Sequence, residues 1–281
     1  MKLGENDGDF DPNSQVTESS IATPTPRYIA APSVPKSTVF RVAVTGGPAA
    51  GKSTALPLVK RLIEAAGFHC MITTEVATRL LESCGGYDPA WAGQPEHIEM
   101  QCAFLDAQIF EEEVMARMAK LRHGPTILIF DRGAVDGIAF CSDEQWAAVL
   151  KHGRTSVPAL LQRYDLVVDM QTVAAFGDGS KYEWGPECIS NKARFHNPAE
   201  ARESALEITA AYAEHPHYCA VAASNDFCAK VDSLFDSIMA AAPMPCAGGA
   251  PVTTPASSLA PAPAAMAHER TLVPPPVKTS F

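Results

Sequence analysis

The chain has 281 residues, a net charge of −10, eight cysteines and a hydrophobic content of 47%. The acidic balance argues against a nucleic-acid partner, because proteins that bind the phosphate backbone usually carry a basic face. The cysteines stand far apart without metal-finger spacing, which indicates reduced thiols, and no apolar run is long enough to span a bilayer. With no secretory or transit signal, we expect a cytoplasmic location.

Both ends of the chain differ in composition from its middle. Residues 1–37 are rich in polar, acidic and proline residues, and we expect a disordered acidic arm. From residue 242 to residue 281 the chain turns to Pro, Ala, Ser and Thr, which predicts a disordered tail. One folded domain over residues 38–241 is therefore expected.

The first expected strand, residues 39–45, leads directly into a glycine-rich turn of the pattern GxxxxGKS. Glycines let backbone N–H groups turn inward around a phosphate, and a helix that begins at Lys52 adds the positive end of its dipole. This pattern predicts nucleoside triphosphate binding, with Lys52 on the β- and γ-phosphates and Ser53 on Mg²⁺. The binding residues are Gly46, Gly47, Pro48, Ala49, Ala50, Gly51, Lys52, Ser53 and Thr54.

A helix over residues 52–66, which Pro57 is expected to bend, precedes a second strand over residues 68–73. Glu75 follows that strand, where its carboxylate can accept the proton of an attacking hydroxyl. The other interpretation is a capping acid for a helix over residues 76–84. Arg79 in that helix orients Glu75 or the acceptor, or it is a solvated helix residue.

The spacing of apolar residues predicts a long helix over residues 97–122 with one apolar stripe. The stripe includes Ile98, Cys102, Leu105, Ile109, Met118 and Leu121. The next strand, residues 126–130, is continuously apolar, as a strand covered on both faces is. Asp131 follows this strand directly. In P-loop proteins this position holds the carboxylate of the Mg²⁺ site.

Asp131 and Arg132 therefore form a second chemical signal. Asp131 ligates Mg²⁺ directly or through water, or acts as a base, and the sequence leaves these roles open beside that of a helix N-cap. Arg132 contacts substrate phosphate or hydroxyls, or forms a structural ion pair.

Residues 173–198 interrupt the apolar pattern and contain glycines, Lys181, Lys192 and Arg194. This composition predicts a mobile lid whose cations surround the transferred phosphoryl group, with Lys192, Arg194 and Arg202 as candidates. A solvated charged face is the alternative. Further strands at residues 166–170 and 218–222 complete an alternation of strands and helices that predicts a parallel α/β sheet, with ligands at the carboxyl ends of its strands.

Several short motifs together resemble the NadR-like AAA domain family of P-loop NTPases, which includes the nicotinamide riboside kinase domain of NadR proteins and TRPL translocation defect proteins. The motifs are residues 42–54, 75–78, 131–137, 163–165, 199–202, 215–217 and 225–227. The resemblance implies a kinase-like three-layer α/β/α sandwich that binds ATP or GTP with Mg²⁺. It also implies that Asn225, Asp226 and Phe227 approach the nucleotide base. The lid departs from the family's pattern at residues 176–184 and 191–196, so acceptor specificity does not carry over.

Two classes of function follow from these features. The first is a phosphotransferase that moves the γ-phosphoryl group to a small hydroxylated, nucleoside-like acceptor, with Lys52, Asp131 and the lid cations stabilising charge and Glu75 or Asp131 as the base. The second is a nucleotide-dependent switch that presents a surface to a protein or a phosphoinositide. Glu75 and the basic lid favour the enzyme, whereas the long arms favour the interaction protein.

Overall fold

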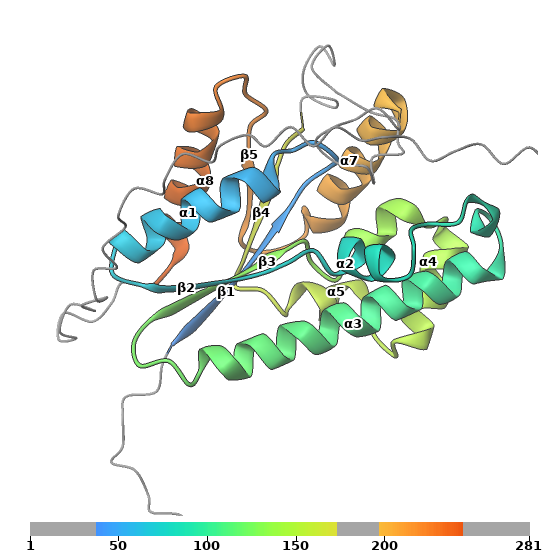
Figure 1. Ribbon diagram of the computed structural model, residues 1–281, viewed down its shortest axis with the longest axis horizontal. Helices are drawn as coiled ribbons and strands as arrows, with labels where there is room; N and C mark the ends of the chain where they lie inside the picture. Colours follow the sequence, from blue (N-terminus) through green and yellow to red (C-terminus); the bar gives the residue numbers. More distant parts are fainter. Residues whose placement is uncertain (1–37, 173–196, 244–281) are drawn as a thin grey trace, which may run out of the picture. The chain divides into compact units, whose positions relative to one another are not determined.

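The computed structural model describes residues 38–172 and 197–243, which contain a five-stranded sheet with the order β2-β3-β1-β4-β5 (Figure 1). All strand pairs are parallel. The strands are β1 (Val39–Thr45), β2 (His69–Thr73), β3 (Thr126–Asp131), β4 (Leu166–Met170) and β5 (Tyr218–Val221). The predicted parallel α/β class is confirmed.

Helices cover both faces of this sheet and complete the three-layer sandwich that the family resemblance implied (Figure 1). The helices α1 (Lys52–Ala65) and α8 (Phe227–Ala241) pack on one face. The opposite face carries α3 (Pro95–Ala119), α4 (Asp143–His152), α5 (Val157–Leu161) and α7 (Pro198–Tyr212). The remaining elements are α2 (Val76–Ser83) and the 3-10 helices η1 (Pro89–Trp91) and η2 (Asp136–Phe140). Among the described helices, none is both long and apolar enough to cross a bilayer.

The central strands supply both hydrophobic cores by alternation. Val42 and Val44 of β1 pack under α1 and α8, while Ala43 between them faces α3 and α7. In β3, Ile129 likewise packs in the core under α1 and α8, while Phe130 packs in the core on the opposite face. Because successive side chains of a strand point to opposite faces, a strand buried on both sides must be apolar throughout. This requirement explains the continuous apolar runs of the sequence.

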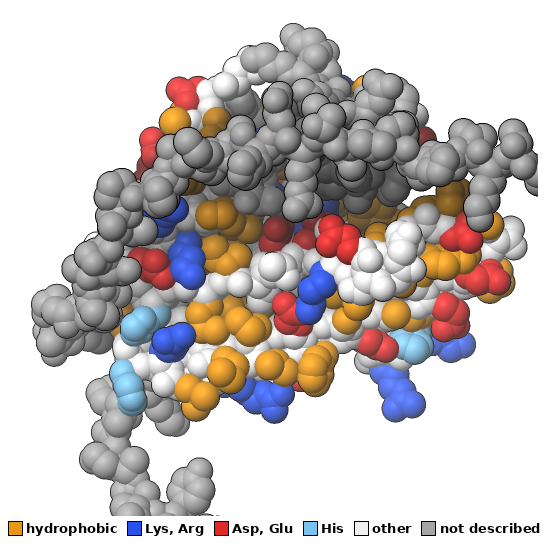
Figure 2. Space-filling model, viewed as in Figure 1, with side chains coloured by type: hydrophobic (Ala, Val, Ile, Leu, Met, Phe, Trp, Pro, Cys, Tyr) orange, Lys and Arg blue, Asp and Glu red, His pale blue; other side chains and the backbone are white. Residues whose placement is uncertain are grey.

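The long helix α3 departs from the predicted stripe at its carboxyl end. The helix ends at Ala119 rather than at residue 122, and the last two residues of the predicted apolar stripe lie outside the core, because Met118 is 50% exposed and Leu121 is 70% exposed. Figure 2 shows hydrophobic side chains at the surface along α3. The inner side of the helix instead carries Gln108 and Glu112, whose polar groups are satisfied by partners within the fold.

Three helices that the apolar pattern did not predict, α4, α5 and α7, begin at side-chain caps. Ser142 and Asn197 each form a capping box with the residue three positions later, and Ser156 caps α5. A search for these capping signals would have located their first turns. Helix α1 runs through Pro57 without interruption.

The strand order determines where the functional side chains meet. Strand β1 lies between β3 and β4, and the register places Val44 beside Asp131 and Thr45 beside Asp169. Adjacent strands are about 4.8 Å apart. The loop after β1 is therefore flanked directly by the carboxyl ends of β3 and β4.

Candidate active site

The turn between β1 and α1 has a backbone that only glycine accommodates at two positions. Gly46 has a φ of +131°, and a Cβ there would lie 2.3 Å from the carbonyl oxygen of Met170. Gly51 has a φ of +87° and stands immediately before Lys52, the first residue of α1. The glycines of the motif thus let the loop pass close to β4 and start α1 with its N–H groups facing outward.

Lys52 is buried and donates a hydrogen bond from Nζ to the carbonyl oxygen of Gly46 at 2.8 Å. Burial, followed by the nearby charge of Arg132, lowers its pKa to about 8, although Asp131 and Glu75 oppose the shift. The ammonium therefore lies folded back on the loop in a place that is largely removed from water. A bound phosphate would add negative charge beside it.

Asp131 lies at the end of β3 and is buried. Within the described residues, its Oδ1 atom has no hydrogen-bond partner. Burial raises the pKa of this carboxyl, and Lys52 opposes the shift. A buried carboxylate oxygen without a partner, near Lys52 and hence near the start of the helix that carries the exposed residue Ser53, fits a Mg²⁺ site, because this ion takes one or two protein oxygens together with phosphate and water. The described residues contain no cluster of three or more acidic, His or Cys ligands, so a metal cage built entirely of protein groups is not present among them.

Arg132 connects the carboxylates of the site. Its Nε donates to Glu75 at 2.6 Å and its Nη1 donates to Asp136 at 2.9 Å. Burial alone would lower the pKa of Arg132, but Glu75 and Asp136 outweigh it and keep the guanidinium charged. Arg79, the other arginine considered for Glu75, pairs with Glu111 instead. The structural ion pair expected as one role of Arg132 is therefore present.

Asp136 anchors this arrangement, and the sequence singled it out only as part of a family motif. Its carboxylate accepts hydrogen bonds from Thr45 at 2.9 Å, Tyr212 at 2.8 Å and the backbone N–H of Gly133 at 3.1 Å. These donors come from β1, from α7 and from the turn after β3. Asp136 thereby fixes the guanidinium of Arg132 relative to the phosphate loop.

Glu75 caps the start of α2 by position but makes no side-chain cap hydrogen bond. Burial would raise its pKa, but Arg132 and Lys52 outweigh this effect and lower it. Glu75 is therefore an ionised carboxylate that lines a cavity next to the phosphate loop. This placement supports the acceptor-side interpretation over the capping one.

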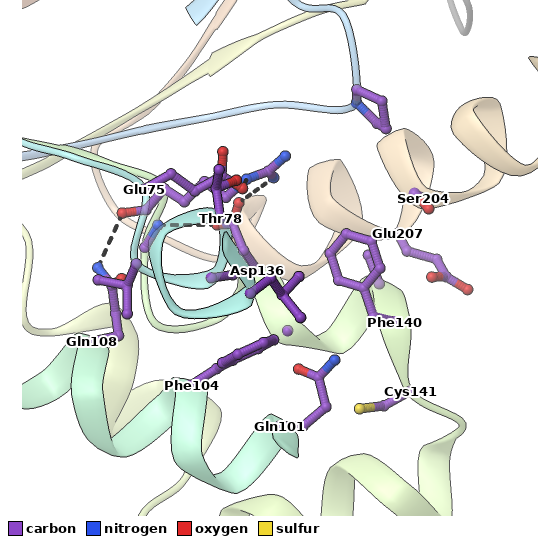
Figure 3. Close-up of a pocket in the computed structure, with 18 of the residues that line it drawn as sticks. Glu75, Thr78, Gln101, Phe104, Gln108, Asp136, Phe140, Cys141, Ser204 and Glu207 are labelled. Carbon is purple, nitrogen blue, oxygen red and sulfur yellow. Dashed lines mark hydrogen bonds and ion pairs between the residues drawn. The ribbon is translucent and has the colours of Figure 1, made fainter. Parts of the chain in front are cut away.

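That cavity has a volume of about 730 Å³ and extends from the phosphate loop to the inner side of α3. Such a size is typical of small-molecule sites. Figure 3 shows Glu75 and Asp136 at one side, Gln101, Phe104 and Cys141 at another, and Ser204 and Glu207 projecting from α7. Further lining residues are Trp146, Phe140, Glu200 and Glu203. Burial, followed by the charge of Cys102, raises the pKa of Cys141 to about 12, so this thiol stays protonated.

Two side chains outside the motif hold the phosphate loop from behind, and sequence reasoning missed both. Thr172, after β4, donates from Oγ1 to the carbonyl of Pro48 at 2.7 Å. Lys230 of α8 donates from Nζ to the carbonyl of Ala50 at 2.8 Å and to that of Gln171 at 2.6 Å. No short motif marks them, because a threonine after a strand and a lysine in a helix are usually solvent-facing.

The structure describes some of the remaining predicted site residues and not others. Lys192 and Arg194 lie outside the described residues. Arg202 is exposed on α7, whereas the α7 residues that line the cavity are acidic or small. Asp226 caps α8, and the Phe227 ring would be 3.4 Å from a Cβ added to Gly51, so this loop adjoins the phosphate loop.

A parallel sheet with a glycine loop after its central strand, a buried lysine on that loop and a carboxylate on the neighbouring strand define a P-loop nucleotide-binding fold of the kinase-like type. A family model described as an AAA domain matches residues 41–230, which is more than half of the chain. The chain belongs to this AAA domain family, and the resemblance to NadR-like domains is confirmed. None of the curated proteins compared with the chain matches it.

Solved structures with a similar fold are distant in sequence. One is a NadR protein in complex with NR, at 13% identity and a TM-score of 0.48, where the match covers 73% of this chain and 52% of that chain. A second is shikimate kinase from Acinetobacter baumannii in complex with shikimate, at 16% identity and a TM-score of 0.39, with coverages of 72% and 94%. A third is deoxyadenosine kinase from M. mycoides with bound dATP, at 14% identity and a TM-score of 0.47, with coverages of 71% and 99%. The chain thus spans about half the length of the NadR chain. At these identities the likeness concerns the fold alone.

Proposed function

We propose that this protein is a Mg²⁺-dependent phosphotransferase that binds ATP or GTP and moves the γ-phosphoryl group to a small hydroxylated, nucleoside-like acceptor. The observation that carries the proposal is a single cavity whose wall includes the phosphate loop, Glu75 and the inner side of α3. A donor and an acceptor held in one cavity can be aligned for direct transfer, and alignment supplies much of the rate in this chemistry.

On the donor side, the loop N–H groups and Lys52 bind the β- and γ-phosphates, and the ammonium balances charge on the transferred group. Ser53 and Asp131 would hold Mg²⁺, which when bound neutralises charge shared by the β- and γ-phosphates. The orphaned oxygen of Asp131 supports this assignment.

On the acceptor side, Glu75 accepts the proton of the attacking hydroxyl. The O–H bond breaks towards the carboxylate while the acceptor oxygen forms a bond to the γ-phosphorus, and the nucleoside diphosphate leaves. Arg132 holds Glu75 in place through their 2.6 Å ion pair. Asp131 is the less suitable base, because Glu75 lines the cavity and Asp131 does not.

The far wall of the cavity suits a flat, hydroxylated molecule. Phe104 and Trp146 offer aromatic surface, and Gln101 offers an amide that both donates and accepts hydrogen bonds. A nucleoside presents a flat base and ribose hydroxyls to such a wall. Neither the described residues nor the comparisons support a phosphoinositide in this place.

The test combines isothermal titration of ATP and GTP with Mg²⁺ and phosphorus NMR of the same samples with a panel of nucleosides and ribosides. We expect micromolar or tighter binding and acceptor-dependent formation of the diphosphate. Lys52→Ala should abolish triphosphate binding, while Lys60→Ala, an exposed change on the same helix, should leave it unchanged. Tight binding without turnover across the panel would replace the enzyme with the nucleotide-dependent switch.

A further inference from the structure

Lys230 and Thr172 hold the phosphate loop by its carbonyl groups. The Nζ of Lys230 bonds the carbonyl of Ala50, and the Oγ1 of Thr172 bonds that of Pro48. In a trans peptide, the carbonyl of one residue and the N–H of the next point in opposite directions. Holding these two carbonyls away from the cavity therefore directs the N–H groups of Ala49 and Gly51 towards the opposite side of the loop, where an anion would bind.

The same logic applies at the loop's other peptide groups. The carbonyl of Gly46 accepts from Lys52 at 2.8 Å, and that of Gly47 accepts from the N–H of Ala50 at 3.3 Å. The loop carbonyls of Gly46, Gly47, Pro48 and Ala50 thus each have a donor within the protein. Two of these donors come from the loop and its helix, whereas Thr172 and Lys230 come from β4's end and from α8.

Lys230 also ties the loop to its surroundings. Its ammonium bonds Gln171 as well as Ala50, and the side chain is only 5% exposed. Burial lowers the pKa of Lys230 to about 8, because the ammonium is largely removed from water. Asp169, the nearby acid, already accepts hydrogen bonds from Thr209 and Tyr218. Packing alone would favour an apolar residue at this position, so the hydrogen bonds of the ammonium to the two carbonyls are the feature to explain.

We propose that Lys230, assisted by Thr172, is a positioning residue that aims the N–H groups of the phosphate loop at the polyphosphate of the bound nucleotide. This role rests on the proposed nucleotide binding. It gives α8 a part in phosphate recognition. This part is separate from the approach of residues 225–227 to the nucleotide base that the family resemblance implies.

The experiment compares Lys230→Met, Lys230→Arg and Thr172→Val with the wild-type chain. Lys60→Met is the matched control, because it makes the same change at an exposed position of α1. The binding of MgATP and of magnesium tripolyphosphate, which has no base, is measured by isothermal titration. The amide signal of Gly51 is followed by NMR in the ligand-free protein, and the thermal midpoint is recorded for each variant.

Lys230→Met should weaken both ligands by about the same factor, roughly tenfold to a hundredfold, since a charged hydrogen bond is lost. It should also shift the Gly51 amide signal. Thr172→Val should weaken both by about threefold to tenfold and shift the Ala49 amide, while Lys230→Arg should recover most of the affinity. Lys60→Met should stay within about twofold of the wild type.

Weaker ATP binding with unchanged tripolyphosphate binding would overturn the proposal, because Lys230 would then act through residues 225–227, which the family resemblance places near the nucleotide base. An unchanged Gly51 amide in Lys230→Met would overturn it as well, whether or not a nucleotide binds. If the wild type binds neither ligand, the proposed function fails, and the amide signals still decide the positioning role. Should Lys230→Met not fold, Thr172→Val with the Ala49 amide carries the same test.

Discussion

The pKa values of two carboxylates in the site are shifted in opposite directions because each has different neighbours. Burial raises the pKa of Asp131, whereas Arg132 and Lys52 outweigh burial at Glu75 and lower its pKa. Carboxylates whose environments push their pKa values apart usually have separate roles. Here the desolvated Asp131 suits a metal ion, and the ionised Glu75 suits the acceptor hydroxyl.

The role proposed for Glu75 predicts the behaviour of Glu75→Gln. The amide keeps the shape of the side chain but cannot take a proton, so kcat should fall by about a hundredfold or more while the nucleotide Kd changes by less than about threefold. Steady-state kinetics and titration measure the two effects. Glu82→Gln, further along α2, is the control. A parallel loss of nucleotide affinity and thermal stability would instead assign Glu75 to folding through its pair with Arg132.

The low pKa of Lys52 predicts a pH dependence of nucleotide affinity. Because the pKa in the folded protein is lowered to about 8, the ammonium is charged below that pH and loses its proton above it. The association constant should therefore be nearly flat from pH 7 to about 7.5 and fall at higher pH, by at most tenfold per unit. The Lys230→Met variant should keep the same fall, which separates the titration of Lys52 from that of Lys230. A flat profile up to pH 9.5 in the wild type would contradict the assignment.

At the scale of elements, α3 shows why the spacing of apolar residues predicts a helix but not which of its residues are buried. Glu112 is fully buried on it and accepts hydrogen bonds from Arg163, Tyr164 and Gln108, so the inward side of this helix is partly ionic. Apolar periodicity assumes that polar residues face water. That assumption fails where partners distant in the sequence satisfy a buried acid.

The buried network predicts a large difference between two neighbouring substitutions. Glu112→Ala removes a fully buried carboxylate that pairs with the partly buried Arg163 and accepts from Tyr164, and it should lower the free energy of unfolding by about 3–5 kcal/mol. Glu113→Ala removes a side chain that is 61% exposed and pairs with Arg163 only at 3.6 Å, so its effect should be below about 1 kcal/mol. Urea unfolding followed by circular dichroism measures both. Equal effects would show that the network contributes little to stability.

The strands and the phosphate loop were predictable because local sequence determines them. Strands β1 and β4 have the predicted bounds, and β2 and β3 differ from the prediction by one residue at one end. A short, continuously apolar run between turns indicates a buried strand. The contacts of Arg132 were not predictable, because Glu75 lies 57 residues away and only the sheet order brings the two together. The role of Lys230 depends on a carbonyl 180 residues earlier.

For the whole molecule, the site draws on the carboxyl ends of four neighbouring strands, and the cores lie on either side of them. Every described core residue lies between Val39 and Ala242. The family match covers residues 41–230 of the same range. Folding and nucleotide binding are thus expected to reside in this part of the chain.

A chain trimmed to residues 38–243 tests that expectation. Its thermal midpoint should stay within about 3 °C of the full chain, because the trimmed chain keeps both cores, and 1 kcal/mol corresponds to roughly 2–4 °C at this size. Its affinity for MgATP should be equal to that of the full chain. A drop of ten degrees or more would place stabilising contacts in the removed segments.

Arg132 has a φ of +72°, a conformation that glycine adopts freely and arginine does not. Any other replacement keeps the backbone strain and loses the guanidinium, whereas glycine relieves the strain but leaves Glu75 and Asp136 without their shared cation. In a mutational scan, glycine should therefore be less destabilising than the other neutral replacements at position 132, although turnover should be lost in all of them. The strained backbone at position 132 is thus retained together with the side chain that gives both carboxylates a cation.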